Sequence, residues 1–140
     1  MTEKQIADYI SSLFKQNGIT VSATGNKIGY KPETIYYWLR LSTHITLDGL
    51  SDILQYFDQQ PAVKADGKYY RDILGYLKRA IMGKKKEVYA LFPKHEYGRK
   101  NIKAWTTGER KMKVAVLIKI LNVLGAELVI LKRGKNERTL

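Results

Sequence analysis

The sequence repeats itself at a fixed offset, the one that separates Trp38 from Trp105, and this repeat limits the folds that the chain can adopt. The clearest match lies between TIYYWLRLSTH and NIKAWTTGERK, where these two tryptophans align. Because one register without a gap covers several segments, the repeat indicates two copies of one fold rather than a shared helical periodicity. The other apolar matches include Ile6 with Ile73, Tyr9 with Tyr76, Val21 with Val88, Ile35 with Ile102, Leu50 with Leu117 and Ile53 with Ile120.

The boundaries of the two copies follow from the segment between them. DQQPAVKADGK contains Pro61, Gly67 and several polar residues, a composition typical of a linker. The expected organisation is a first domain over 1–60, a linker over 61–67, a second domain over 68–133 and a basic tail over 134–140.

Each copy is expected to be helical. Apolar residues from Ile6 to Phe14 follow helical spacing, and Gly18 is expected to end this first helix. Thr20 is a suitable N-cap for a second helix over 21–28, and Pro32 suits the first turn of a third. A fourth apolar stripe begins at Leu47, so the expected fold class is all-α, with four or five short helices in each copy.

The segment TVSATGNKIGYKPETIYYWL, residues 20–39, resembles the helix-turn-helix of the lambda-repressor and Cro-like DNA-binding family, of the xenobiotic-response-element type. In that pattern a small residue lies in the second helix, here Gly25, and a glycine opens the turn, here Gly29. A branched apolar residue, here Ile35, anchors the third helix in the core. The resemblance extends over the flanking helices and implies two tandem helix-turn-helix domains.

The second copy departs from this pattern. Phe92 stands at the position of the small residue, Glu96 at that of the turn glycine, and Pro93 would disrupt the second helix. Ile102 and Trp105 keep their places. The expected result is the same fold with an altered corner and a shifted third helix.

The resemblance also implies a set of DNA-facing residues, because the third helix of such a unit enters the major groove. Arg suits guanine, Asn adenine and Thr a thymine methyl group, whereas Lys and Tyr suit phosphates. The implied set is Lys31, Thr34, Tyr36, Tyr37 and Arg40 in the first copy, and Arg99, Lys100, Asn101, Lys103, Thr107, Arg110 and Lys111 in the second.

The positive charge is confined to one half of the chain. The net charge is +12, but residues 1–66 hold six basic and seven acidic side chains, whereas residues 67–140 hold 19 basic and six acidic ones. Neutralised phosphates supply most non-specific affinity for nucleic acid. The second copy is therefore expected to be the main anchor on DNA, while the first either contacts a neighbouring half-site or binds a protein.

The C-terminal segment AELVILKRG bears on assembly. Leu128 to Leu131 is a branched apolar run after Gly125, and the run predicts a short strand. It is similar to the terminal strand of antitoxin-type members of the same family, which pairs with its counterpart in a second subunit. That likeness implies a homodimer through this strand. The alternative is a pseudo-dimer within one chain that covers two half-sites about one helical turn apart.

Several classes of function are disfavoured. The chain has no cysteine, and His44 and His95 are not at metal-ligand spacing. No glycine-rich phosphate loop and no long apolar run is present, and MTEKQIADYI lacks the layout of a secretory signal. We therefore expect no enzyme activity, cofactor, metal site or membrane association, and a cytoplasmic, nucleoid-associated protein.

The sequence as a whole predicts a protein that binds specific sequences of double-stranded DNA and regulates transcription, as a repressor does in a bacterium or phage. Two alternatives remain. One is an antitoxin-like or adaptor protein whose first domain binds a protein partner. The other is an RNA-binding module, which would use the charge and the exposed aromatic side chains but would not explain the helical corner.

Overall fold

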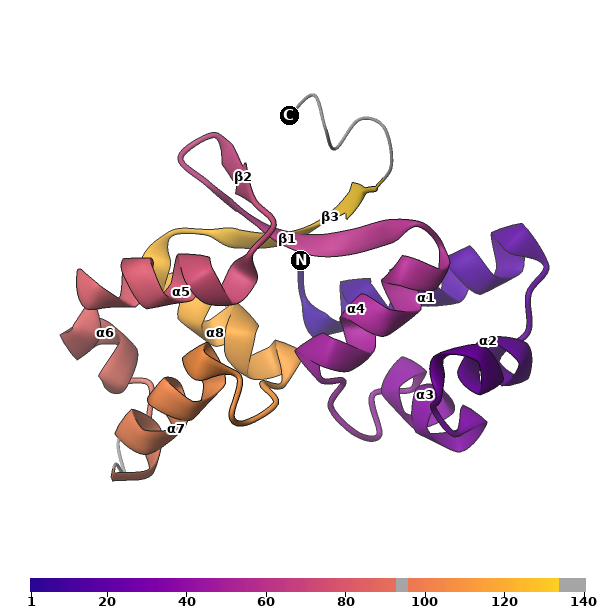
Figure 1. Cartoon of the computed structure of the whole chain (residues 1–140), viewed down its shortest axis with the longest axis horizontal. Helices are drawn as coiled ribbons and strands as arrows, with labels where there is room; N and C mark the ends of the chain where they lie inside the picture. Colours follow the sequence, from indigo (N-terminus) through magenta and orange to yellow (C-terminus); the bar gives the residue numbers. More distant parts are fainter. Residues whose placement is uncertain (93–95, 134–140) are drawn as a thin grey trace.

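The computed structural model describes residues 1–92 and 96–133, with the backbone alone for residues 96–99. The described chain is mainly helical, with eight helices and a small antiparallel sheet (Figure 1). The elements are α1 (Glu3–Asn17), α2 (Val21–Ile28), α3 (Pro32–Leu39), α4 (Leu47–Tyr56), β1 (Gln59–Ala65), β2 (Lys68–Tyr70), α5 (Ile73–Met82), α6 (Lys85–Tyr89), α7 (Glu96–Thr107), α8 (Val114–Leu124) and β3 (Glu127–Lys132).

The structure carries the repeat found in the sequence. Four helices and a strand, α1 to α4 and β1, are followed by four helices and a strand in the same order, α5 to α8 and β3. The fourth helix begins at Leu47 in one copy and at Val114 in the other, and these two residues are equivalent in the repeat. Among the described elements only β2 has no counterpart, because it occupies the positions equivalent to Met1–Glu3, which lie before α1 and at its first residue.

Local signals in the first copy place its helices as predicted. The Thr20 side chain accepts a hydrogen bond from the backbone N–H of Ala23 at 3.1 Å and caps α2. Gly29 ends α2 in the left-handed region, at φ +82°, and Pro32 is the first residue of α3. Gly18 likewise ends α1 with a left-handed conformation.

The chain is mainly helical, as the expected fold class has it, but a three-stranded sheet stands where one strand was expected, and this sheet corrects the linker over 61–67. Most of this linker lies in β1, which pairs with β2 on one side and with β3 on the other. Pro61 suggested a linker because proline cannot donate to a strand ladder. The register explains why it is tolerated here: β2 reaches only as far as Val63, so within the described sheet β1 has a single neighbouring strand at Pro61.

The C-terminal strand forms as predicted, but its partner lies in the same chain. β3 runs antiparallel to β1, the equivalent strand of the first copy. On this edge β3 is paired by the first half of the chain, and within the described sheet β3 is an outer strand. A homodimer through the strand stays a prediction. The tail over 134–140 lies outside the described residues.

The pairing register has the pattern of a local two-fold axis. Ala62 pairs with Val129, which is its own equivalent in the repeat. The isolated bridge between Thr46 and Lys113 also joins two equivalent residues. The first pair belongs to β1 and β3, which lie in the sheet at the top of Figure 1, and the second pair directly precedes α4 and α8. An axis through both pairs exchanges the two copies.

The two copies share their core. One hydrophobic cluster of described residues contains Leu50, Ile53 and Leu54 of the first copy together with Leu117, Ile120 and Leu121 of the second. Helix α1 of the first copy also packs on α8 of the second. Because the apolar surface of each copy is buried partly against the other, the chain is expected to fold as one unit.

Candidate nucleic-acid interface

The corner between α2 and α3 is closed and requires its glycines. A Cβ atom added to Gly25 would lie 2.7 Å from the backbone oxygen of Tyr30, closer than such atoms approach in proteins. Ile35 is fully buried beside it, 3.4 Å from the same added atom. The small residue, the turn glycine and the apolar anchor of the predicted motif therefore occupy the positions that a tight helical corner needs.

Trp38 fixes α3 against the rest of the first copy. Its side chain is buried and packs edge-on against Tyr30, with ring centroids 5.3 Å apart. The tip of its ring also covers Gly49 of α4, where an added Cβ atom would lie 2.6 Å from Cη2. The tryptophan in the opening match is thus a core residue of the first copy.

A hydrogen bond ties the same corner to α4. The hydroxyl of Tyr30 donates to the Asp52 carboxylate at 2.7 Å. Burial is the main cause of a raised pKa of Tyr30, and the bond to Asp52 and its charge add to it. The neutral phenol is therefore the form that the folded state stabilises.

The outer face of α3 is aromatic with little charge. Tyr36 and Tyr37 are each 45% exposed, and the Arg40 guanidinium lies 5.5 Å from the centre of the Tyr37 ring. Lys31 is exposed just before the helix, and Thr34 is half-buried. All five predicted residues of the first copy thus reach solvent on or beside α3.

The second copy differs from the first in the helices that flank the corresponding corner. Helix α6 ends at Tyr89, whereas the repeat places its end near position 95, and α7 begins at Glu96 rather than near position 99. Phe92, at the position of Gly25, packs on Trp105 with ring centroids 5.5 Å apart. This is the altered corner and shifted third helix that the sequence predicts, although Pro93 itself lies outside the described residues.

Trp105 is only partly buried, unlike Trp38. Val116 of α8 stands at the position of Gly49, so the fourth helix of this copy lacks the space that receives the tryptophan ring in the first. The two third helices are therefore held in different ways.

The outer face of α7 is basic. Lys100 and Lys103 are exposed on the helix, and Arg110 and Lys111 are exposed in the loop after it. Lys84, Lys85, Lys86 and Lys113 of the same copy are exposed as well. The side chain of Arg99, also predicted to face DNA, lies outside the described residues.

Three of the predicted residues of the second copy, Asn101, Thr107 and Arg110, already have hydrogen-bond partners within the protein. The Asn101 side-chain oxygen accepts a hydrogen bond from Nη1 of Arg110 at 2.6 Å, which ties the loop to the helix. The Thr107 hydroxyl donates to the Lys103 carbonyl at 2.9 Å. Asn101 would need both its amide oxygen and its amide nitrogen to read adenine, and the oxygen is occupied by Arg110. In the free protein the pair therefore holds the loop against the helix, and Asn101 can read a base only if Arg110 turns away.

Both third helices lie on one side of the molecule. In Figure 1, α3 and α7 occupy the two lower ends of the molecule, away from the sheet, and the loops that follow them approach the centre. The sequence did not indicate Leu41, which follows Arg40 with a left-handed φ of +58° and is 41% exposed. No composition signal marks it, because its exposure results from the turn that ends α3.

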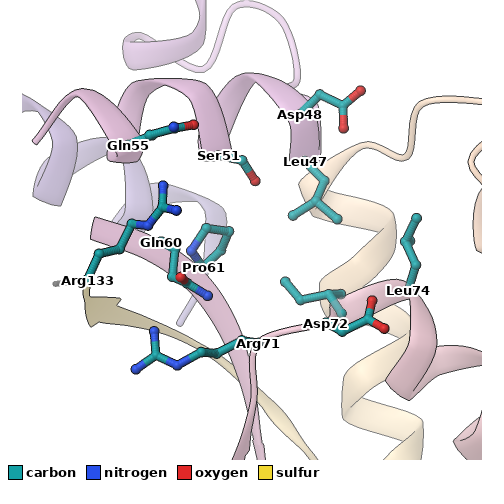
Figure 2. Close-up of a pocket in the computed structure, with 11 residues that line it drawn as sticks. Leu47, Asp48, Ser51, Gln55, Gln60, Pro61, Arg71, Asp72, Leu74 and Arg133 are labelled. Atoms are coloured by element: carbon teal, nitrogen blue, oxygen red, sulfur yellow. The ribbon is translucent and has the colours of Figure 1, made fainter. Parts of the chain in front are cut away.

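A polar pocket of about 290 Å³ lies between the two copies, lined by α4, β1 and the start of α5 (Figure 2). Arg71 and Arg133 lie at one end, and Asp48 and Asp72 at the other. At the equivalent place α1 packs on α8, but α5 begins later than the repeat requires, because β2 and the turn after it take up its first positions. The two-fold relation between the copies is therefore broken at the pocket. This break could not be predicted from the sequence, because β2 was not predicted.

Comparisons with known proteins add no assignment: no family model matches the chain, and neither the curated proteins nor the solved structures give a significant match. Within residues 1–92 and 96–133, no helix is long and apolar enough to cross a bilayer, and no group of three histidine or carboxylate side chains could hold a metal ion.

Proposed function

We propose that this protein binds specific sequences of double-stranded DNA through the side that carries α3 and α7, and regulates transcription as a repressor-like protein of the cytoplasm and nucleoid. The closed α2–α3 corner is the observation that carries this proposal, because it holds a short helix with one face in the core and the other in solvent. Such a helix is the element that enters the major groove in helix-turn-helix proteins. The basic α7 on the same side supports it.

In this proposal the second copy is the main electrostatic anchor. Its third helix and the following loop expose Lys100, Lys103, Arg110 and Lys111, whereas the first copy offers Lys31 and Arg40. Each phosphate contact contributes to affinity through the release of bound counterions, whatever the shape of the helical corner. The first copy contributes contacts from Tyr36, Tyr37 and Thr34.

The test compares two double variants that remove equal charge. Lys100→Ala with Lys103→Ala removes two exposed cations from α7, and Lys68→Ala with Lys132→Ala removes two from the sheet on the other side. Each lost phosphate contact lowers the slope of log affinity against log salt by about 0.9. The α7 variant is expected to lose about 1.8 in slope on duplex DNA, and the sheet variant almost nothing.

The same titration separates the alternatives. Equal losses from both variants would mean that binding follows net charge and not this face. A preference for single-stranded RNA over duplex DNA would assign the exposed aromatics to base stacking instead. No binding to either nucleic acid would overturn the proposal.

A protein partner for the first copy is the second candidate function. Tyr36, Tyr37 and Leu41 are large side chains between 41% and 45% exposed at one end of α3. Aromatic residues are enriched in the centres of protein interfaces. This candidate predicts that Tyr37→Ala leaves DNA affinity unchanged, whereas DNA contact by α3 predicts a loss.

A further inference from the structure

The geometry points to one chain occupying two inverted and unequal half-sites on a single DNA duplex, so that one protein molecule binds each site in one fixed orientation. This inference depends on the proposed function and names its target: an imperfect palindrome rather than a direct repeat. It follows from three observations, namely the register of the two copies, the way they are joined, and the difference between their third helices.

The register sets the orientation. A tandem repeat on a flexible linker could place its copies side by side in the same direction. Here Ala62 pairs with Val129 and Thr46 with Lys113, and each of these residues meets its own equivalent. Only a two-fold relation brings equivalent residues together in antiparallel pairs. Half-sites read by two-fold-related helices are inverted, as in the operators of symmetric dimers.

The connection between the copies sets the stoichiometry. The backbone N–H of Leu47 donates to the Met112 carbonyl at 2.8 Å, and that of Val114 donates to the Ile45 carbonyl at 2.9 Å. These two bonds are themselves equivalent in the repeat, and they lie at the end of the axis away from the sheet. Together with the β1–β3 pairing and the shared core, they hold α3 and α7 in one packed body. A second chain is not needed to supply the other half of the site.

The third helices make the half-sites unequal. Helix α3 has eight residues and belongs to the less basic copy. Arg40, directly after it, lies over the Tyr37 ring. Helix α7 has 12 residues and exposes Lys100 and Lys103. Side chains that differ at the outward positions select different bases, and the more basic end favours more phosphate contacts. The protein therefore prefers one of the two directions in which it could lie along the duplex.

The absence of cysteine gives a direct assay of this orientation. Ser42 and Glu109 are exposed equivalents in the loops after α3 and α7, so Ser42→Cys and Glu109→Cys give matched single attachment points for a DNA-cleaving iron chelate. The full-length chain is first used to select binding duplexes from a random library. Each labelled variant is then bound to the selected duplex, and the mass of the complex is measured by native mass spectrometry.

The expected result is one chain per duplex, two inverted half-sites of different sequence, cleavage by the Ser42→Cys conjugate in one half only, and cleavage by the Glu109→Cys conjugate in the other half only. Two chains on the minimal site, a direct repeat, identical halves, or cleavage of both halves by each conjugate would overturn the inference while leaving DNA binding intact. A library that yields no enriched duplex would overturn the proposed function itself, and the inference with it.

Discussion

Replacing Gly25 with alanine tests whether α2 packs as closely against the backbone of the α2–α3 turn as it does in the structure. Alanine in a helix is ordinarily favoured over glycine by about 1 kcal/mol. Here the new methyl group would lie 2.7 Å from the Tyr30 carbonyl oxygen, which is backbone and cannot turn aside. Overpacking of this kind costs about 2–3 kcal/mol, at the upper part of its usual range. The net loss is about 1–2 kcal/mol of unfolding free energy.

The assay is thermal unfolding followed by circular dichroism. At about 3 °C per kcal/mol for a chain of this size, Gly25→Ala is expected to lower the Tm by ~3–6 °C. Gly83→Ala is the matched control, because Gly83 ends α5 at φ −83° with its nearest neighbouring atom 3.8 Å from the added Cβ. That variant should keep or slightly raise the Tm. A Gly25→Ala protein as stable as the parent would refute the close corner, and with it the support for a helix-turn-helix.

Three further outcomes follow from the packing. Trp38→Ala is expected to cost about 3–5 kcal/mol and Trp105→Ala clearly less, both measured by urea unfolding, and each variant should still show one transition because the core is shared. Tyr30→Phe should cost about 1 kcal/mol at pH 8 through the lost bond to Asp52. The pKa of Tyr30 is higher in the folded state than its ordinary value of 10.0, so the parent's extra stability over Tyr30→Phe is complete below pH 10.0 and falls as the pH rises further. The unfolding free energies of the two proteins, measured with urea, should therefore converge at high pH. Deleting 126–140 removes β3 and should abolish cooperative unfolding, whereas survival of a folded core would contradict the role given to this strand.

Local chemistry made the first copy predictable. Thr20, Gly29 and Pro32 each act within a few residues of their own position, so the ends of α2 and α3 could be predicted without knowledge of the rest of the chain. The repeat then extended the prediction to the second copy. Its register also holds in the structure, because α4 and α8 begin at equivalent residues.

The sheet could not be predicted in the same way. β1 contains Pro61 and short or polar residues, and it becomes a strand because β3, near the other end of the chain, pairs along its length. A pairing between segments so distant in sequence leaves little local signal. The sequence therefore predicted a linker and a partner strand in another subunit, and it left the two-fold relation between the copies as one alternative among others.

The candidate site was predictable in part. The exposure of Tyr36, Tyr37, Lys100 and Lys103 follows from helical periodicity once the buried residues are known. The bond between Asn101 and Arg110 depends on how the loop folds back on α7, which residue types and spacing do not determine. The same holds for the pocket beside Arg71, which exists because β2 and its turn replace the start of a helix.

The face that DNA covers can be measured directly by the reactivity of lysine side chains. The full-length chain, free and bound to duplex DNA, is treated briefly with an acylating reagent, and the modified residues are quantified by mass spectrometry. If DNA covers the side of α3 and α7, Lys100, Lys103 and Lys111 are strongly protected in the complex, while Lys68 and Lys132 on the sheet stay as reactive as in the free protein. Protection of the sheet lysines with continued reactivity of those on and after α7 would contradict this placement of the DNA.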